Sequence, residues 1–256
     1  MAYVFYRSIK EGRMGKEYNI TTVIPARAGS KRLANKNTRL LCGRPMIEYT
    51  IEAAQHSRCI RGLNVVVSTN DSEVMRITGM MATEMMREGK QVGVPYIRKR
   101  PERLGADNAS QVDVIIDSVA WLEEMGVETE WVVLLQPTSP LRSAEDIDKA
   151  LETMIMSNAH SLVSVSEAQE APCDMMDFSG RMIPIKKDVL HLFLNGAIYI
   201  TRYDHLVKRR SFYTPSETLL YFMPKWRGID VDDEGDFLVA DYIMRGVLNG
   251  KLSSLQ

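Results

Sequence analysis

The chain has 256 residues, of which 45% are hydrophobic and 25% are charged, and its formal net charge is −1. These ordinary globular values exclude a broad attraction to nucleic acid or to a membrane surface. No apolar run approaches the ~20 residues of a membrane span. The widely spaced Cys42, Cys59 and Cys173 argue against disulfide or zinc frameworks, so a reducing cytoplasm is the expected location.

Residues 1–18 differ in character from the rest of the chain. They carry early charges and lack the apolar core of a signal peptide, so we expect a loose leader there. Residues 19–256 are expected to form a single domain, because their number suits one large α/β unit.

From residue 19 onward, apolar strand-like runs alternate with segments of helical periodicity. Strands are predicted at 19–26, 63–68, 93–97, 131–135, 161–165, 195–200 and 218–223. Helices are predicted at 45–57, after caps at Asp71 and Ser143, at 111–125 and at 234–248. This alternation predicts an α/β fold with a doubly wound, mostly parallel sheet. Ligands bind such sheets outside the carboxyl ends of the strands.

Two stretches depart from this alternation. At about 167–194, charges, prolines and a glycine interrupt the pattern, and a hairpin-like excursion is predicted. At 78–90 a methionine-rich segment places Met80, Met81, Met85 and Met86 at helical spacing. Core filling is the favoured interpretation, because methionine adapts to irregular gaps, and a surface facing a partner is the alternative.

The loop after the first predicted strand, residues 25–37 (PARAGSKRLANKN), is rich in cations. Arg27, Lys31, Arg32 and Lys36 surround Gly29 and Ser30. Glycine lets backbone N–H groups approach an anion, and the cations neutralise it, so a triphosphate is the natural ligand. The loop matches neither a Walker motif nor a GxGxxG fingerprint. An exposed basic turn is the alternative.

Two further polar loops follow predicted strands. Residues 136–142 (QPTSPLR) combine stiffening prolines with Gln136, Thr138, Ser139 and Arg142, which suits the binding of hydroxyls or a carboxylate. Residues 99–111 are turn-rich and could present backbone groups to a base. For residues 136–142 taken alone, an ordinary connection that starts a helix at Ser143 is the favoured interpretation, and for residues 99–111 a plain surface loop is the alternative.

The segment 229–233 (IDVDD) contains a pair of carboxylates. Alternation places Asp230 and Asp232 on one face of an extended segment, where they repel each other unless a cation lies between them. Mg²⁺ prefers one or two carboxylates plus phosphate oxygens, which is the arrangement a nucleotidyltransferase needs. The alternative is a solvated acidic turn that caps the last helix, and this is the favoured interpretation of Asp233 and Glu234.

Taken in order, these segments resemble the acylneuraminate cytidylyltransferase (CMP-sialic acid synthetase) family from about residue 22 to residue 248. The matching blocks are IPARAGSKRLANKN, VVVSTND, RPERLGAD, LLQPTSPLR, NGAIYI and IDVDDEGDF. The resemblance implies a Rossmann-like nucleotidyltransferase fold and transfer of CMP from CTP to a nonulosonic (sialic-like) acid, with pyrophosphate released. It also implies a homodimer in which the excursion reaches into the partner's site.

The resemblance implies residue roles as well. CTP would be bound by Arg27, Ser30, Lys36, Asn37, Arg100, Ala109 and Ser110. The sugar acid would be bound by Gln136, Thr138, Ser139 and Asn195. Mg²⁺ would be held by Asp230 and Asp232. Arg27, Lys36 and Asp232 would carry catalysis, through positioning and charge stabilisation rather than through an evident general base.

The acceptor half of the chain departs from the family pattern. Before NGAIYI the family usually carries an RRQ-L-P-like run, whereas this chain offers Lys186, Lys187 and His191 as its cationic residues. A legionaminic or pseudaminic type of acceptor, or a non-sialic acceptor, therefore remains open. Other interpretations are a nucleotidyltransferase for another nucleotide and a non-catalytic nucleotide-binding protein.

Overall fold

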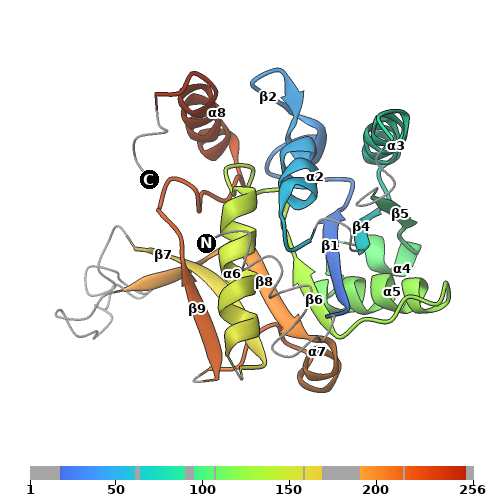
Figure 1. The fold of residues 1–256 in the computed structure, drawn as a ribbon. Helices are drawn as coiled ribbons and strands as arrows, with labels where there is room; N and C mark the ends of the chain where they lie inside the picture. Colours follow the sequence, from blue (N-terminus) through green and yellow to red (C-terminus); the bar gives the residue numbers. More distant parts are fainter. Residues whose placement is uncertain are drawn as a thin grey trace, which may run out of the picture.

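A seven-stranded sheet forms the centre of the computed structural model, which describes residues 18–60, 64–89, 95–106, 108–157, 159–168, 191–215 and 217–251 (Figure 1). The strand order is β5-β4-β1-β6-β8-β7-β9. The strands are β1 (Ile20–Ala26), β4 (Asn64–Thr69), β5 (Tyr96–Lys99), β6 (Trp131–Leu134), β7 (Ser161–Glu167), β8 (Leu192–Arg202) and β9 (Thr218–Phe222).

The sheet is mostly parallel, as predicted. Strand β1 pairs in parallel with β4 and β6, β4 with β5, and β7 with β9. Within the described part of this seven-stranded sheet, the antiparallel pairs are those that β8 forms with β6 and β7. The carboxyl ends of β1, β4 and β6 therefore lie at one edge of the sheet, where the loops of a doubly wound fold bind their ligands.

Helices cover both faces of the sheet. The α-helices are α2 (Met46–His56), α3 (Ser72–Arg87), α4 (Glu102–Gly105), α5 (Gln111–Glu123), α6 (Ala144–Met156), α7 (Tyr203–Arg209) and α8 (Glu234–Leu248). Along β6, Trp131 and Val133 pack into the cluster that contains α2 and α6. Val132 and Leu134 pack into the cluster that contains α5 and α7. Burial on both faces explains why β6 (WVVL) is an unbroken apolar run.

The predicted caps at Asp71 and Ser143 are present. The Asp71 carboxylate accepts the Glu73 N–H at 2.9 Å and begins α3. Ser143 and Asp146 form a reciprocal capping box at α6, and Asp233 forms one with Asp236 at α8. The interpretation of Asp233 as a helix cap is therefore confirmed, because its side chain satisfies N–H groups that a helix leaves unpaired.

A separate apolar cluster joins the start of the chain to its end. Leu33 and Leu41 pack with Val231 and Phe237, and Arg39 forms a two-contact ion pair with Glu234 (2.5 and 2.7 Å). Leu41 belongs to a short ribbon of β2 (Leu40–Leu41) and β3 (Arg44–Pro45). The cluster contains residues of both the cationic loop and the acidic segment, so it fixes the two relative to each other.

Several elements differ from the prediction. The third strand spans Tyr96–Lys99 rather than 93–97, and β8 begins three residues before the predicted 195. The β2–β3 ribbon and the seven-residue α7 were not predicted, since neither is long enough to show a period. The leader up to residue 17 lies outside the described residues, as do residues 169–190 of the excursion. Glu167 and residues 192–194, which the predicted excursion included, instead belong to β7 and β8, where Glu167 pairs with Leu192.

The methionine-rich segment divides between core and surface. Met85 is buried and Met81 packs against the main core, as the core-filling interpretation requires. Met80 and Met86 are 59% and 62% exposed, so that interpretation is wrong for these two. The difference follows from geometry, because one side of α3 alone can face the sheet. None of the helices in the described part of the chain has both the length and the apolar composition of a membrane span.

Candidate active site

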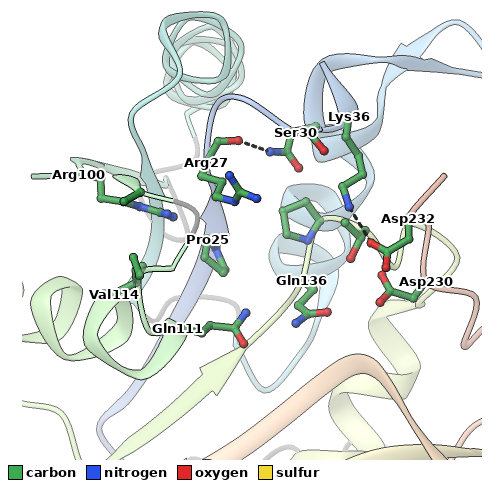
Figure 2. A pocket seen from close by; sticks show the side chains of 15 residues that line it. Pro25, Arg27, Ser30, Lys36, Arg100, Gln111, Val114, Gln136, Asp230 and Asp232 are labelled. Atoms are coloured by element: carbon green, nitrogen blue, oxygen red, sulfur yellow. Dashed lines mark hydrogen bonds and ion pairs between the residues drawn. The ribbon is translucent and has the colours of Figure 1, made fainter. Parts of the chain in front are cut away.

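A pocket of about 310 Å³ lies at the carboxyl ends of β1, β5 and β6. Its walls come from segments that are far apart in the sequence: the cationic loop after β1, the connection from β5 to α5, the loop after β6 and the acidic segment before α8 (Figure 2). Four loops thus converge at the strand ends where folds of this kind bind their ligands.

The cationic loop contributes one wall of the pocket. Arg27, Ser30, Lys36 and Asn37 all line it. Lys36 and Asn37 belong to a short 3-10 helix, η1 (Lys36–Thr38), and the Asn37 amide donates to the Arg27 carbonyl at 3.1 Å. Gly29 has φ +75°, a conformation that glycine adopts without steric cost. The loop therefore folds back on itself and presents Arg27 and Lys36 to the same space.

The two carboxylates of the acidic segment lie opposite Arg27 and Arg100 (Figure 2). Lys36 Nζ lies 2.9 Å from one oxygen of Asp232, and this hydrogen bond lowers the pKa of Asp232. Burial raises the pKa of Asp230, and the charge of Asp232 raises it further. Asp230 Oδ1 is buried and has no hydrogen-bond partner among the described residues. The pair is thus asymmetric, with one carboxylate held by a lysine and one with an unmet buried oxygen.

Residues between β5 and α5 form the far end of the pocket. Arg100, Ala106, Ala109, Gln111 and Val114 line it there. Arg100 is almost fully buried, and its guanidinium donates to the Ser68 carbonyl at 2.8 Å. Burial, with a smaller contribution from the charge of Arg27, lowers the pKa of Arg100 to about 10, so it stays protonated at neutral pH. The predicted Ser110 is the N-cap residue of α5 and is not among the lining residues.

The loop after β6 brings some of the predicted acceptor residues to the pocket and not others. Gln136 and Thr138 line it, whereas Ser139 is fully buried and does not. Asn195 is also buried, with its amide between the hydroxyls of Ser164 (2.6 Å) and Ser166 (2.9 Å). Ser139 and Asn195 therefore lie behind the pocket wall, and their contact with the acceptor stays a prediction.

The adjacent glycine, rather than Asn195, comes close to the pocket. Gly196 has φ +76°, and a Cβ there would lie 2.6 Å from Gln136 Oε1 and 3.5 Å from Asp230 Oδ2. The tight packing of β8 backbone against these two side chains keeps Gln136 and Asp230 in place. Of the cationic candidates before β8, Lys186 and Lys187 lie outside the described residues, and His191 is not among the residues lining the pocket.

Comparison with known proteins identifies the family. A family model described as cytidylyltransferase matches residues 21–90. Over 236 residues the chain is 34% identical to the CMP-N,N'-diacetyllegionaminic acid synthase of Legionella pneumophila, covering 88% of this chain and 96% of that protein. The chain belongs to the acylneuraminate cytidylyltransferase family. The resemblance seen in the sequence motifs is thereby confirmed.

This cytidylyltransferase is also similar to longer proteins. It is 34% identical over 240 residues to the N-acylneuraminate cytidylyltransferase of Streptococcus agalactiae, covering 87% of this chain and 54% of that protein. The chain thus spans about half the length of that relative. Over 145 residues it is 29% identical to the pseudaminic acid cytidylyltransferase of Campylobacter jejuni, which is 57% of each protein.

Solved structures support the fold of the cytidylyltransferase. CMP:2-keto-3-deoxy-manno-octonic acid synthetase, in complex with CTP, superposes with a TM-score of 0.64 at 19% identity, covering 89% of this chain and 98% of that one. The 4-diphosphocytidyl-2C-methyl-D-erythritol synthase of Anaerococcus prevotii gives 0.58 at 13% identity, covering 89% and 96%. Identities this low show a shared fold, and the fold predicted from the sequence is confirmed.

The donor set of this cytidylyltransferase is compatible with a magnesium ion that also binds a nucleotide. The buried, unpartnered Asp230 Oδ1 is a free ligand atom, and Asp232 lies beside it. No cluster of three His, Cys, Asp or Glu suited to a metal occurs within the residues described. Mg²⁺ needs only one or two carboxylates where phosphates complete its shell, so the pair fits a metal carried in with a triphosphate rather than a resident protein-only site.

Five lining residues were not among the predicted site residues: Pro25, Ala106, Gln111, Val114 and Pro137. Gln111 had a usable signal, since it is the first helical residue after Ser110 at a predicted helix start, and the start of α5 points toward the strand ends. Val114 is an apolar residue of the same helix, so its spacing in the sequence predicts a core residue rather than a pocket residue. Figure 2 shows Gln111 and Gln136 facing the same part of the cavity, with Pro25 between Gln111 and Arg27.

Proposed function

We propose that this protein transfers CMP from CTP to a nonulosonic (sialic-like) acid and releases pyrophosphate. The observation that carries the proposal is one pocket in which Arg27 and Lys36 face Asp230 and Asp232. Nucleotidyl transfer requires cations that bind the phosphates and carboxylates that hold a metal ion. The activities for which the relatives are named, which include synthesis of CMP-N,N'-diacetyllegionaminic acid, support the substrate class.

In the proposed complex, Arg27, Ser30, Lys36 and Asn37 bind the triphosphate. Arg100 and Ala109 border the cytosine at the far end of the pocket. Asp230 and Asp232 hold Mg²⁺, which when bound neutralises phosphate charge. Lys36, which pairs with Asp232 at 2.9 Å, lines the same pocket and would contact the nucleotide there.

The proposed chemistry is a single displacement at phosphorus. A hydroxyl oxygen of the sugar acid forms a bond to the α-phosphorus, and the bond from that phosphorus to the oxygen bridging to the β-phosphate breaks. Pyrophosphate leaves with that electron pair, and the hydroxyl proton passes to solvent or to a basic oxygen in the pocket. Arg27 and Lys36 stabilise the charge on the phosphate oxygens through the transition state. Gln136 and Thr138 orient the acceptor.

Pyrophosphate release tests the proposal directly. The purified protein is assayed with ATP, CTP, GTP or UTP against N-acetylneuraminic, N,N'-diacetyllegionaminic, pseudaminic and 2-keto-3-deoxy-octonic acids, with and without Mg²⁺. We expect release only with CTP, Mg²⁺ and one of the first three acids. Binding of CTP without release across the panel would instead favour a nucleotide-binding protein. Release with another nucleotide or only with a different acceptor would reassign the enzyme.

A homodimer in the cytoplasm completes the proposal. The acceptor-binding cations would then come from the excursion of a partner subunit, and cytoplasm would supply CTP. Light scattering coupled to size exclusion tests the assembly, and cell fractionation tests the location. A monomer with full activity would contradict the first part, and a secreted protein the second.

A further inference from the structure

A turn directly before the acidic segment is tied to the start of α6. The turn follows β9, and its Arg227 N–H donates to the Pro224 carbonyl at 2.9 Å. The Arg227 side chain reaches α6, where its Nε lies 3.1 Å from Asp146 Oδ2. This Nε has no hydrogen-bond partner among the described residues, so the contact is an ion pair held by charge. Because α6 packs against β7 and β8, the ion pair anchors the turn to the central sheet (Figure 1).

Asp146 is a buried carboxylate that needs a cation. It is 1% exposed and accepts hydrogen bonds from the Ser143 N–H (3.0 Å), the Ser143 hydroxyl (2.8 Å) and the Tyr221 hydroxyl (3.2 Å). None of these three donors is charged, and a buried carboxylate without a cation nearby is costly. Arg227 supplies the charge, with 17% of its side chain exposed. Removal of the arginine would therefore disturb the turn that it anchors.

Gly228 joins this turn to the acidic segment and lies against the wall behind the active site. It is buried, and its N–H donates to carbonyls within the same turn (3.1 and 3.2 Å), so it moves with the turn. A Cβ at this position would clash with Ser166 Oγ and would lie 2.6 Å from Asn195 Nδ2. The backbone therefore packs directly against side chains of β7 and β8, and the ion pair of Arg227 keeps it there.

Asp230 lies two residues after Gly228 and depends on this backbone for its position. Its Oδ1 is buried without a hydrogen-bond partner among the described residues, so no described hydrogen bond orients that atom. On the far side, the Val231 N–H donates to the Thr138 carbonyl at 2.7 Å. Asp230 is thus positioned by two backbone anchors, the turn that contains Arg227 and the hydrogen bond from Val231.

We propose that Arg227 is a positioning residue for metal binding, because its ion pair with Asp146 sets the place of the Asp230 carboxylate at the pocket wall. The inference rests on the proposed function, in which Asp230 and Asp232 hold Mg²⁺ together with a nucleotide. Arg227 itself does not line the active-site pocket, so it acts through the backbone. Replacement of a residue that orients a metal ligand typically costs about 10- to 100-fold in metal affinity.

Calorimetric titration of the full-length protein with CTP tests the proposal, once with saturating Mg²⁺ and once with EDTA. We expect Arg227→Met to weaken CTP binding about tenfold or more with Mg²⁺ and by less than about twofold with EDTA. A substitution that only loosened the fold would weaken both alike. Wild-type affinity of the variant in Mg²⁺, or equal losses in the two conditions, would overturn the proposal. If CTP binding by wild type did not respond to Mg²⁺, the proposed metal role of Asp230 and Asp232 would fall as well.

Arg58 provides a matched control on the same helix. Its Nε lies 3.0 Å from Oδ2 of Asp148, which is 3% exposed on α6, but Arg58 belongs neither to the turn nor to the lining of the active-site pocket. We expect Arg58→Met and Arg227→Met both to lose stability, since each leaves a buried carboxylate without its cation. Only Arg227→Met should lose the Mg²⁺-dependent affinity. An equal loss in Arg58→Met would show a general loosening and would overturn the proposal.

A charge-balanced variant covers the case in which Arg227→Met does not fold. Asp146→Asn removes the carboxylate that needs a cation, so the double variant Asp146→Asn with Arg227→Met contains no unpaired carboxylate at this position. We expect the double variant to show the same Mg²⁺-specific loss of CTP affinity. Ser143→Ala disturbs the capping box without touching Arg227 and should leave both affinities unchanged. Wild-type affinity of the double variant in Mg²⁺ would overturn the proposal.

Discussion

Lys36 and Asp232 form the central ion pair of the active-site pocket, with Nζ and Oδ1 2.9 Å apart. The lysine follows β1 and the aspartate precedes α8, so the contact joins residues 196 positions apart. The hydrogen bond from Lys36 lowers the pKa of Asp232. Its contribution to stability is therefore present above the unfolded-state pKa and is lost as the pH falls through the lowered folded-state pKa.

Replacement of Lys36 should damage catalysis far more than loss of a surface ion pair would. We expect Lys36→Met to lower turnover with CTP by about a hundredfold, because one charge contact to the transition state is removed. Arg32→Met is the matched control, since Arg32 also pairs with Asp232 (3.2 Å) but is 74% exposed and does not line the pocket. Its loss should cost about fivefold at most. Equal losses in steady-state assays of the two variants would contradict the assigned role.

Asp230 is expected to lower the stability of the protein while it supports catalysis. Its folded-state pKa is raised by burial, so the folded protein binds a proton there more tightly than the unfolded chain does. Deprotonation at neutral pH therefore destabilises the metal-free protein. Asp230→Asn removes that charge, and we expect unfolding to shift upward by roughly 2–4 °C at neutral pH while pyrophosphate release is abolished.

The pH dependence of this effect identifies its cause. The gain in melting temperature should shrink as the pH falls through the raised pKa of Asp230, because wild type then carries a neutral side chain as well. Thermal unfolding of both proteins over an acidic pH series, without metal, measures the difference. A gain that is constant with pH, or a loss of stability at neutral pH, would rule out a buried charge as the reason.

The converging loops could be predicted from the sequence because each follows or precedes an element with a clear period. The run before Gln136 (WVVLL) is unbroken and apolar and the run before Arg27 (ITTVIPA) is mostly so, which places both residues at strand ends. The alternation of Asp230 with buried Val231 likewise predicted one shared face for the two carboxylates, and both line the pocket.

Two of the predicted residues that do not line the pocket lie next to residues that shape it. Ser139 follows Thr138, which lines the pocket, and Asn195 precedes Gly196, whose backbone packs against the lining residues Gln136 and Asp230. A polar residue in a loop or at a strand end can either face the ligand or form hydrogen bonds with buried polar groups of the protein. The residue type alone does not distinguish these two roles. Asn195 takes the second role, because Ser164 and Ser166 on β7 need a buried partner.

That interior role of Asn195 has a measurable signature. Asn195→Ala would leave the hydroxyls of Ser164 and Ser166 without this partner, and we expect a loss of about 2–4 kcal/mol in the free energy of unfolding. Asn249→Ala, on the exposed end of α8, should change it by less than about 0.5 kcal/mol. Gln136→Ala should instead raise the KM for the acceptor with little change in stability. If Asn195→Ala raised the acceptor KM and left denaturant unfolding unchanged, the residue would face the substrate after all.

Gly196 provides the sharpest test of how β8 shapes the pocket. Its φ of +76° makes any side chain unfavourable, and Ala at this position would bring Cβ to 2.6 Å from Gln136 Oε1. Gly126 has a similar φ of +83°, but a Cβ there would meet nothing within 4 Å, so Gly126→Ala carries the backbone cost alone. We expect both variants to lose about 1 kcal/mol of stability from the backbone. Only Gly196→Ala should also raise the acceptor KM, because Gln136 must move. Equal kinetic parameters in the two variants would mean that the contact between β8 and Gln136 does not shape the acceptor site.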